Sequence, residues 1–256
     1  MDTTGWRAPL LWRAAQLLAR AAVGALGHLE VTGDVPAELR RGPLVLAANH
    51  ISLFDPVVLA AACRARGIAP RIMATGGLFR TPVLGALMRR AGHIRVDRGT
   101  TSVHQALDTA AAAVARGSVV LVYPEGRIGL APGMWPERGK TGAARLAFAS
   151  GAPVVPVAQW GSHEVLPYRA PQGMLRGIAH AVRRRPVIRV HFGAPVALAD
   201  VPPGSPGAAR RATDRIIDAI TDCLVPLRPD EPDGPRHVDP GRPVDVSRIH
   251  RRHLAG

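Results

Sequence analysis

The chain has 256 residues, enough for one sizeable α/β domain, and 47% of them are hydrophobic, so wholesale disorder is excluded. Lys and Arg number 33 against 19 acidic residues, which gives a formal net charge of +14. Such a surplus favours phosphate, whether on nucleic acid, on anionic lipid or on a small substrate. Aromatic residues make up only 4% and are not interleaved with basic ones, so lipid is favoured and no nucleic-acid partner is expected.

The cysteines and histidines give no sign of a metal site. Cys63 and Cys223 lie far apart in Ala-rich or helical-looking sequence, so we expect two reduced, packed thiols and a cytoplasmic protein. His93, His104 and His163 lack the spacing of metal ligands. No metal and no resident cofactor are therefore expected.

The first 27 residues are apolar but carry charges. Arg13 and Arg20 interrupt the run, and no uncharged stretch of about 18 residues, the length needed to span a bilayer, occurs in the chain. We interpret residues 1–27 as an amphipathic helix in the membrane interface, with Trp6 and Trp12 at headgroup depth. The alternative interpretation is an ordinary helix packed against the core.

The middle of the chain alternates short apolar strands with helices. Strands are predicted at residues 28–32, 44–48, 71–74, 94–96, 118–123, 154–158 and 187–192, and helices at residues 57–66, 81–90, 102–115, 141–149 and 207–224. This alternation predicts one α/β domain, residues 28–227, with a mostly parallel central sheet flanked by helices. Pro, Asp, Arg and Gly dominate residues 228–256, which are predicted to be a disordered basic tail.

A histidine and an aspartate follow the second predicted strand. His50 comes directly after this apolar run, and Asp55 stands five positions later at the predicted start of a helix. Loops at the carboxyl ends of parallel strands are the usual place for sites in open α/β sheets. A turn between the two residues lets the carboxylate hold one imidazole nitrogen while the other acts as a base. No Ser or Cys nucleophile is equally evident, so a substrate hydroxyl is the expected nucleophile.

A second polar loop follows the predicted strand at residues 118–123. It begins Pro124-Glu125-Gly126-Arg127, where the glycine permits close backbone approach and the carboxylate beside Arg127 could organise a phosphate site. The competing interpretations are simpler: His50 as a structural hydrogen-bonding residue, and this loop as a strand-terminating turn.

These two blocks together resemble the 1-acyl-glycerol-3-phosphate acyltransferase family, also called the lysophospholipid acyltransferases. Asn49-His50 through Asp55 matches the family's first block, Asn-His-x4-Asp, and residues 124–126 match the start of its third block, Pro-Glu-Gly.

Two further segments, in the expected order, extend the resemblance. Residues 92–98 resemble the second block, whose last residue, here Arg98, is held to bind the acceptor phosphate. Residues 154–157, Val-Val-Pro-Val, resemble the fourth block, an apolar strand near the acyl site.

The chain also departs from the family pattern. Thr75 and Gly77 stand where the family commonly has Lys and Glu, which removes a cation from the expected acceptor site. The third block usually continues Gly-Thr-Arg-Ser, but here Arg127 follows the glycine directly. Lys140 could replace the lost charge, or it could be a solvated lysine.

The resemblance implies an O-acyltransferase of phospholipid synthesis. The donor would be an acyl thioester on coenzyme A or acyl carrier protein, the acceptor a lysophosphatidic acid, and the product phosphatidic acid. His50 would deprotonate the acceptor hydroxyl and Asp55 would orient His50. The residues expected to bind substrate are Asn49, Arg98, Glu125, Gly126, Arg127 and Lys140.

Two other functions remain open at this point. One is acyl transfer to a different lysolipid or to a glycolipid, which the changes at Thr75 and Gly77 favour. The other is a basic module that binds membranes or nucleic acid without catalysis. An enzyme of this kind is expected to attach, as a peripheral or monotopic protein, to the anionic cytoplasmic face of the plasma membrane.

Overall fold

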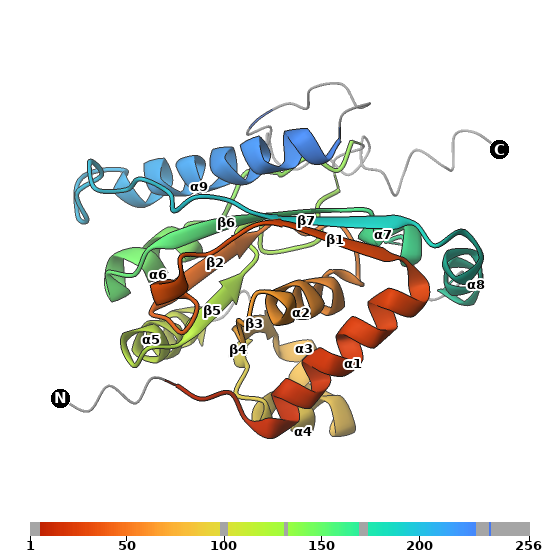
Figure 1. Cartoon of the computed structure of the whole chain (residues 1–256). Helices are drawn as coiled ribbons and strands as arrows, with labels where there is room; N and C mark the ends of the chain where they lie inside the picture. Colours follow the sequence, from red (N-terminus) through yellow and green to blue (C-terminus); the bar gives the residue numbers. More distant parts are fainter. Residues whose placement is uncertain (1–5, 98–101, 131–132, 169–173, 229–235, 237–256) are drawn as a thin grey trace.

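A computed structural model describes residues 6–97, 102–130, 133–168, 174–228 and 236 (Figure 1). Its strands are β1 (His28–Gly33), β2 (Leu44–Ala48), β3 (Arg71–Thr75), β4 (Ile94–Val96), β5 (Val119–Val122), β6 (Val154–Trp160) and β7 (Val187–Phe192). They form one seven-stranded sheet in the order β1-β7-β6-β2-β5-β3-β4. The β6–β7 pairing is antiparallel and the other described pairings are parallel. The predicted α/β fold with a mostly parallel sheet is confirmed.

Helices connect and cover these strands. They are α1 (Leu10–Leu26), α2 (Asp55–Ala65), α3 (Gly76–Arg80), α4 (Pro82–Arg90), α5 (Ser102–Ala115), α6 (Gly142–Ser150), α7 (Ser162–Val165), α8 (Met174–Arg184) and α9 (Ala208–Leu224), with single 3₁₀ turns at η1 (Ala37–Leu39) and η2 (Val225–Leu227). The strand predictions, and the helix predictions from residue 57 onward, agree with these bounds to within about two residues. The helix predicted at residues 1–27 begins only at Leu10, after the non-helical residues 6–9. Three helices, α3, α7 and α8, were not predicted.

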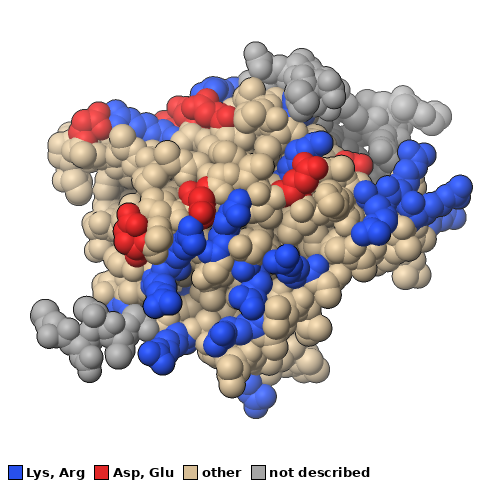
Figure 2. Space-filling model, in the orientation of Figure 1, with Lys and Arg blue, Asp and Glu red and all other residues tan. Residues whose placement is uncertain are grey.

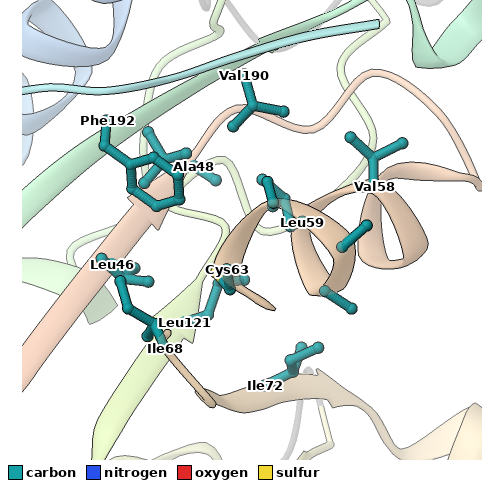
Figure 3. Close-up of a cluster of buried hydrophobic side chains, with 14 of the residues drawn as sticks. Leu46, Ala48, Val58, Leu59, Cys63, Ile68, Ile72, Leu121, Val190 and Phe192 are labelled. Atoms are coloured by element: carbon teal, nitrogen blue, oxygen red, sulfur yellow. The ribbon is translucent and has the colours of Figure 1, made fainter. Parts of the chain in front are cut away.

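Both faces of the sheet are buried, as expected for a parallel sheet covered on two sides. Along β2, Leu46 and Ala48 pack with α1 and α2, whereas Val45 and Ala47 pack with α5, α6 and α9. Figure 1 shows this division, with α1 and α2 below the sheet and α9 above it. Figure 3 shows the core between the sheet and α2, where side chains of β2, β5 and β7 face the helix. Burial on both faces explains why β2 and β5 are continuous apolar runs.

The topology brings several chain segments to one edge of the sheet. Since β2, β5 and β6 run in the same direction, their carboxyl ends lie at one edge. Helices α7 and α8 connect the end of β6 to the antiparallel β7, so they lie at this edge too. Strand β1 is parallel to β7, so the end of α1 arrives at the same edge. The loop after β2 therefore lies at the same edge of the sheet as the ends of β5 and β6, helices α7 and α8, and the end of α1.

Helix α1 has one packed side and one exposed side. Its packed side buries Trp12, Gln16 and Val23, and the Gln16 amide donates hydrogen bonds to the carbonyl oxygens of Ala60, at 3.3 Å, and Ile68, at 2.9 Å. The prediction that Trp12 lies at headgroup depth is wrong, because its ring is buried. A helix can bury an aromatic residue toward the core on one side while keeping apolar residues outward on the other.

The exposed side of α1 remains apolar. Leu10 and Leu18 are 79% and 71% exposed, and Leu17 is also exposed. Arg13 and Arg20, seven residues apart, flank this surface on one side. None of the described helices has the length and hydropathy needed to cross a membrane.

Two residues assigned to the disordered tail are described, and both contact the folded domain. Arg228 is buried, and Arg236 forms ion pairs with Asp218 and Asp222 of α9. The packed chain therefore extends at least one residue beyond the predicted boundary at residue 227. The rest of residues 229–256 lies outside the described residues.

Candidate active site

His50 and Asp55 meet at the carboxyl end of β2. The Nδ1 atom of His50 lies 2.7 Å from Oδ2 of Asp55, whose side chain is fully buried. Because a carboxylate oxygen accepts, Nδ1 carries the proton and Nε2 keeps its lone pair. The His50 side chain is 15% exposed, so the ring is held by the buried Asp55 and remains partly accessible to solvent.

The Asp55 carboxylate is fixed by three further donors. Its Oδ2 also accepts the backbone N–H groups of Ile51 and Ser52, at 2.6 and 2.9 Å, and its Oδ1 accepts the Ser162 hydroxyl at 2.5 Å. Asp55 is the first residue of α2, but its carboxylate turns back onto the preceding loop, and α2 has no side-chain cap. Four donors on one buried carboxylate offset its desolvation and fix its orientation.

The His50 ring also packs against an aromatic face. Tyr123, at the end of β5, stacks on it with ring centroids 4.1 Å apart and an interplanar angle of 17°. Stacking on Tyr123 fixes the plane of the imidazole ring, and the hydrogen bond to Asp55 fixes the orientation of the ring within that plane. The neighbouring strand therefore restrains the base independently of the carboxylate.

Asn49 has a different environment from the one predicted. Its side chain is buried and pairs with the backbone of Gln159, since its Nδ2 donates to the Gln159 carbonyl at 3.0 Å and its Oδ1 accepts the Gln159 N–H at 2.8 Å. The Gln159 amide donates back to the Asn49 carbonyl at 2.9 Å. Asn49 thus joins the ends of β2 and β6 beside His50 and positions the loop between them.

The Pro-Glu-Gly loop wraps around the backbone of His50. The buried Glu125 carboxylate accepts the N–H of His50 at 3.1 Å and the N–H of Glu137 at 2.9 Å, while the Gly129 N–H donates to the His50 carbonyl at 2.7 Å. Gly126 has φ +70°, a left-handed conformation that favours glycine. Glu125 and Gly126 therefore shape the loop that holds the base.

Burial raises the pKa of Glu125 to about 8. The two backbone N–H groups oppose this shift, and the nearby Glu137 and Asp55 carboxylates add to it. Burial thus favours the neutral form of the Glu125 carboxyl group, which lessens the negative charge buried beside Asp55.

Two of the predicted phosphate ligands, Arg127 and Lys140, belong to one loop. The Arg127 guanidinium pairs with the buried Glu137 carboxylate at 2.8 Å, so its charge is already partly compensated. Lys140 is exposed, and its backbone N–H donates to the Pro124 carbonyl at 2.8 Å, which places the residue at the base of the same loop. Arg98 lies outside the described residues, immediately after Asp97 at the carboxyl edge of β4.

The far end of this loop is held by the start of the tail. The Arg228 guanidinium lies between the rings of Trp135 and Trp160, 4.1 and 3.9 Å from their centroids, and donates to the Gly133 carbonyl at 2.7 Å. Stacking of a buried guanidinium on two indoles is a favourable cation–π arrangement. The C-terminal segment thus ties the loop to the end of β6.

Ser162, Tyr123 and Glu137 were not found from the sequence. Ser162 comes two residues after the end of β6, a strand that is parallel to and paired with β2. A polar residue just beyond a neighbouring parallel strand was the available signal. It could be used only once the strand order was known.

Neither cysteine is an activated nucleophile. Burial raises the pKa of Cys63 to about 12, and burial with the Asp222 charge raises that of Cys223 to about 11. No cluster of three or more potential metal-ligating side chains occurs in the part of the chain that is described. What the site offers is an oriented imidazole beside a buried carboxylate at the end of a parallel strand. Such an arrangement is typical of enzymes that activate a hydroxyl with a histidine as general base.

Similarity to known proteins identifies the family of the chain. An acyltransferase family model matches residues 28–160, just over half of the chain, and the chain belongs to this family. The fold is similar to the crystal structure of the 1-acyl-sn-glycerophosphate acyltransferase PlsC of Thermotoga maritima, with a TM-score of 0.63 and 18% identity. That alignment covers 87% of this chain and 81% of the other.

The curated relatives are uncharacterized mycobacterial proteins. One from Mycobacterium tuberculosis and one from Mycobacterium bovis are each 28% identical over 233 residues, with 78% of this chain covered. The chain spans 62% of the length of these relatives.

Proposed function

We propose that this chain transfers a fatty acyl group from an acyl thioester, on coenzyme A or acyl carrier protein, to the free hydroxyl of 1-acyl-glycerol-3-phosphate. The product would be phosphatidic acid, for phospholipid synthesis. The observation that carries the proposal is the His50–Asp55 contact of 2.7 Å at the end of β2, which leaves Nε2 as a base. Membership of the acyltransferase family supports the same chemistry.

The reaction follows from the protonation states of this pair. Nε2 of His50 takes the proton of the acceptor hydroxyl as its oxygen attacks the thioester carbonyl carbon. The carbonyl then re-forms, the carbon–sulfur bond breaks, and the thiolate leaves with the proton from the His50 imidazolium. The Asp55 carboxylate stabilises that imidazolium, and general-base catalysis of this kind contributes about 10²–10⁴-fold.

Direct transfer in a ternary complex is the route that the side chains favour. An acyl-enzyme would need an activated nucleophile, but the raised pKa values of Cys63 and Cys223 keep both thiols protonated. The buried Ser162 hydroxyl is committed to the Asp55 carboxylate. The acceptor oxygen therefore remains the nucleophile.

The phosphate of the acceptor requires cations near this edge. Arg98 is the proposed ligand by its place in the second block, and Lys140 is an exposed cation at the base of the third-block loop. Arg127 contributes less than expected because Glu137 pairs with it at 2.8 Å. Bidentate recognition by Arg98 would suit a phosphate monoester.

A second acceptor class remains a candidate because Glu137 compensates the charge of Arg127. With Arg127 compensated and no lysine near Thr75 where the family pattern has one, the described part of the site offers fewer free cations to a phosphate than the family pattern. Another lysolipid, or a glycolipid, with fewer negative charges would fit such a site. The basic module without catalysis is disfavoured, because it gives no reason for a buried carboxylate with four donors.

The acceptor is an amphiphile, so the enzyme is proposed to work at a membrane surface. The outward leucines of α1, Leu10, Leu17 and Leu18, are suited to burial in the interface, with Arg13 and Arg20 at phosphate depth. In Figure 2 the lower part of the molecule, where α1 and α4 lie, shows Lys and Arg side chains, and the acidic side chains in this view lie higher. We propose peripheral or monotopic attachment to the cytoplasmic face of the plasma membrane.

A substrate panel tests the proposed function. Purified protein would be offered acyl-CoA and acyl carrier protein donors with lysophosphatidic acid, other lysophospholipids and a glycolipid, and product would be measured by mass spectrometry. We expect the highest kcat/KM with lysophosphatidic acid. Preference for a neutral or zwitterionic acceptor would select the second class, and the absence of transfer from every thioester would overturn the enzyme proposal.

A further inference from the structure

Helix α8 is a basic amphipathic helix whose apolar side is exposed. Leu175, Ala179 and Val182 recur at intervals of four and three residues and so share one side of the helix. Leu175 is 83% exposed and Val182 54% exposed. Leu175 is the most exposed of the large hydrophobic side chains in the described chain.

The opposite side of α8 already has its protein contacts. Ala181 is fully buried, and Gly177 approaches α7 so closely that a Cβ atom there would lie 3.0 Å from the Val165 carbonyl oxygen. The exposed stripe is therefore not the side by which α8 joins the fold. It is a second apolar surface on the same helix.

Arginines border the exposed stripe. Arg176 and Arg183, seven residues apart, lie beside Ala179 on the helix surface, and Arg184 and Arg185 end the helix. The helix has no acidic residue. Figure 2 shows the resulting group of Lys and Arg side chains at the right-hand edge of the molecule, over α8. An apolar stripe bordered by cations matches an anionic lipid surface, where such arginines reach phosphate while their stems cover acyl chains.

The carboxyl-terminal ends of α8 and α1 meet. The Arg185 guanidinium donates to the Gly24 carbonyl near the end of α1 at 2.8 Å, and α1 carries exposed leucines of its own, Leu17 and Leu18, less than two turns from this contact. Two adjoining helices with outward apolar residues suit a wide apolar phase better than the small contact area of an acidic carrier protein.

Helix α8 also stands at the edge of the sheet where the site lies. It follows α7 at the carboxyl end of β6, and Ser162 of α7 donates to Asp55. We propose that α8 is a second membrane-contacting helix, which with α1 holds the His50 edge of the sheet against an anionic bilayer. The inference rests on the proposed function in one respect, namely that the acceptor resides in that bilayer.

The apolar part of the proposal is tested with the full-length chain. Leu175→Gln/Val182→Gln would be compared with wild type and with Val225→Gln, an exposed apolar position after α9, by co-sedimentation with phosphatidylcholine–phosphatidylglycerol vesicles. We expect the double variant to lose at least tenfold in partitioning at every salt concentration and the control to lose less than twofold. Unchanged melting temperatures would show that folding is intact.

The basic part is tested with matched charge changes. Arg183→Gln/Arg184→Gln and Arg116→Gln/Arg145→Gln remove the same charge, but Arg116 precedes β5 at the opposite edge of the sheet. We expect the α8 pair to weaken vesicle binding at low salt by about fivefold per residue, and the other pair by much less. Equal losses from both pairs would mean that only net charge acts, and would overturn the proposal.

Activity distinguishes this proposal from the proposed function. With a short-chain, monomeric lysolipid the α8 variants should keep wild-type kcat, whereas with acceptor in vesicles their apparent KM should rise at least tenfold. If no acceptor is acylated, the proposed function fails while vesicle binding still decides the role of α8. Normal vesicle binding with lost binding to an acidic acyl carrier protein would assign α8 to the carrier and overturn the membrane proposal.

Discussion

His50 and His93 lie at opposite edges of one sheet, and their Nδ1 atoms are used in opposite ways. Nδ1 of His50 donates to the Asp55 carboxylate at 2.7 Å, so Nε2 remains a base. Nδ1 of His93, just before β4, accepts the backbone N–H of Ile72 at 3.1 Å, so its lone pair is already used and the proton stands on Nε2. The surroundings complete the contrast, since His50 is partly exposed and His93 is packed against Trp12 with ring centroids 4.3 Å apart.

The comparison teaches that the hydrogen-bond partner of Nδ1 decides what a histidine does here. Both residues stand in blocks that resemble family motifs, so the motif alone does not distinguish a base from a packing residue. A carboxylate partner favours the imidazolium that a general base must form. A backbone N–H partner opposes it, because protonated Nδ1 would face a donor.

The largest expected effect follows from removing the base. His50→Ala should lower kcat at least 100-fold with the fold intact, because general-base catalysis contributes about that much or more. Asp55→Asn should also lower kcat strongly. An amide oxygen can still accept the His50, Ile51 and Ser52 donors, but it supplies no charge to stabilise imidazolium.

Steady-state transfer assays, with circular dichroism as the folding control, would measure both variants. His93→Ala is the matched control, expected to keep kcat while losing stability. A His50→Ala enzyme with more than roughly a tenth of the wild-type rate would show that His50 is not the general base, given the usual size of that effect.

The second prediction concerns the carboxylate's partner on α7. Ser162→Ala removes the donor to Asp55 Oδ1 and leaves a buried lone pair unsatisfied. We expect kcat to fall about tenfold with KM nearly unchanged, since hydrogen bonds to charged groups contribute about 1.5–3 kcal/mol and three other donors remain.

Ser52→Ala is the matched control for this change. Its hydroxyl donates to the Leu166 carbonyl at 2.6 Å and accepts the Phe54 N–H, while its backbone N–H, which holds Asp55, is retained. A smaller loss of kcat at a comparable loss of melting temperature is expected. Equal kcat losses in the two serine variants would reduce Ser162 to a packing residue.

The sequence predicted the parts of the structure that local patterns encode. The continuous apolar run of β2 and the Asn-His-x4-Asp block were enough to predict the parallel sheet and the His50–Asp55 pair. Helix α8 was missed because its apolar residues form a narrow stripe within an Arg-rich segment, with Gly177 inside it. Its packing against α7 stabilises it, and such tertiary stabilisation leaves little trace in a single sequence.

The parts of the site that were missed depend on contacts between distant segments. Ser162 lies 107 positions from Asp55, and Glu137 pairs with Arg127 across a loop whose path no pattern specifies. Trp12 was assigned to the membrane because an amphipathic helix does not show from its sequence which aromatic residue faces the core. The position of His93 on the opposite edge fixes that face, since Trp12 packs on its ring.

The smallest expected effect tests the His93 side of the comparison through stability. Burial, with the adjacent Arg71 charge, lowers the pKa of His93 from 6.5 to about 4. A lowered folded-state pKa means that the unfolded chain binds the proton first as the pH falls below about 6.5, so stability present at higher pH is progressively lost toward pH 4. The loss attributable to this one group should be about 1 kcal/mol between pH 7.5 and 5.5.

Asn can supply an acceptor for the Ile72 N–H without titrating, so the difference in unfolding free energy between wild type and His93→Asn should shrink by that amount over the same interval. Urea unfolding of both proteins at the two pH values measures this difference. Parallel pH dependence of wild type and His93→Asn would mean that His93 is not kept neutral by its burial, and the contrast with His50 would then rest on the Nδ1 hydrogen bonds alone.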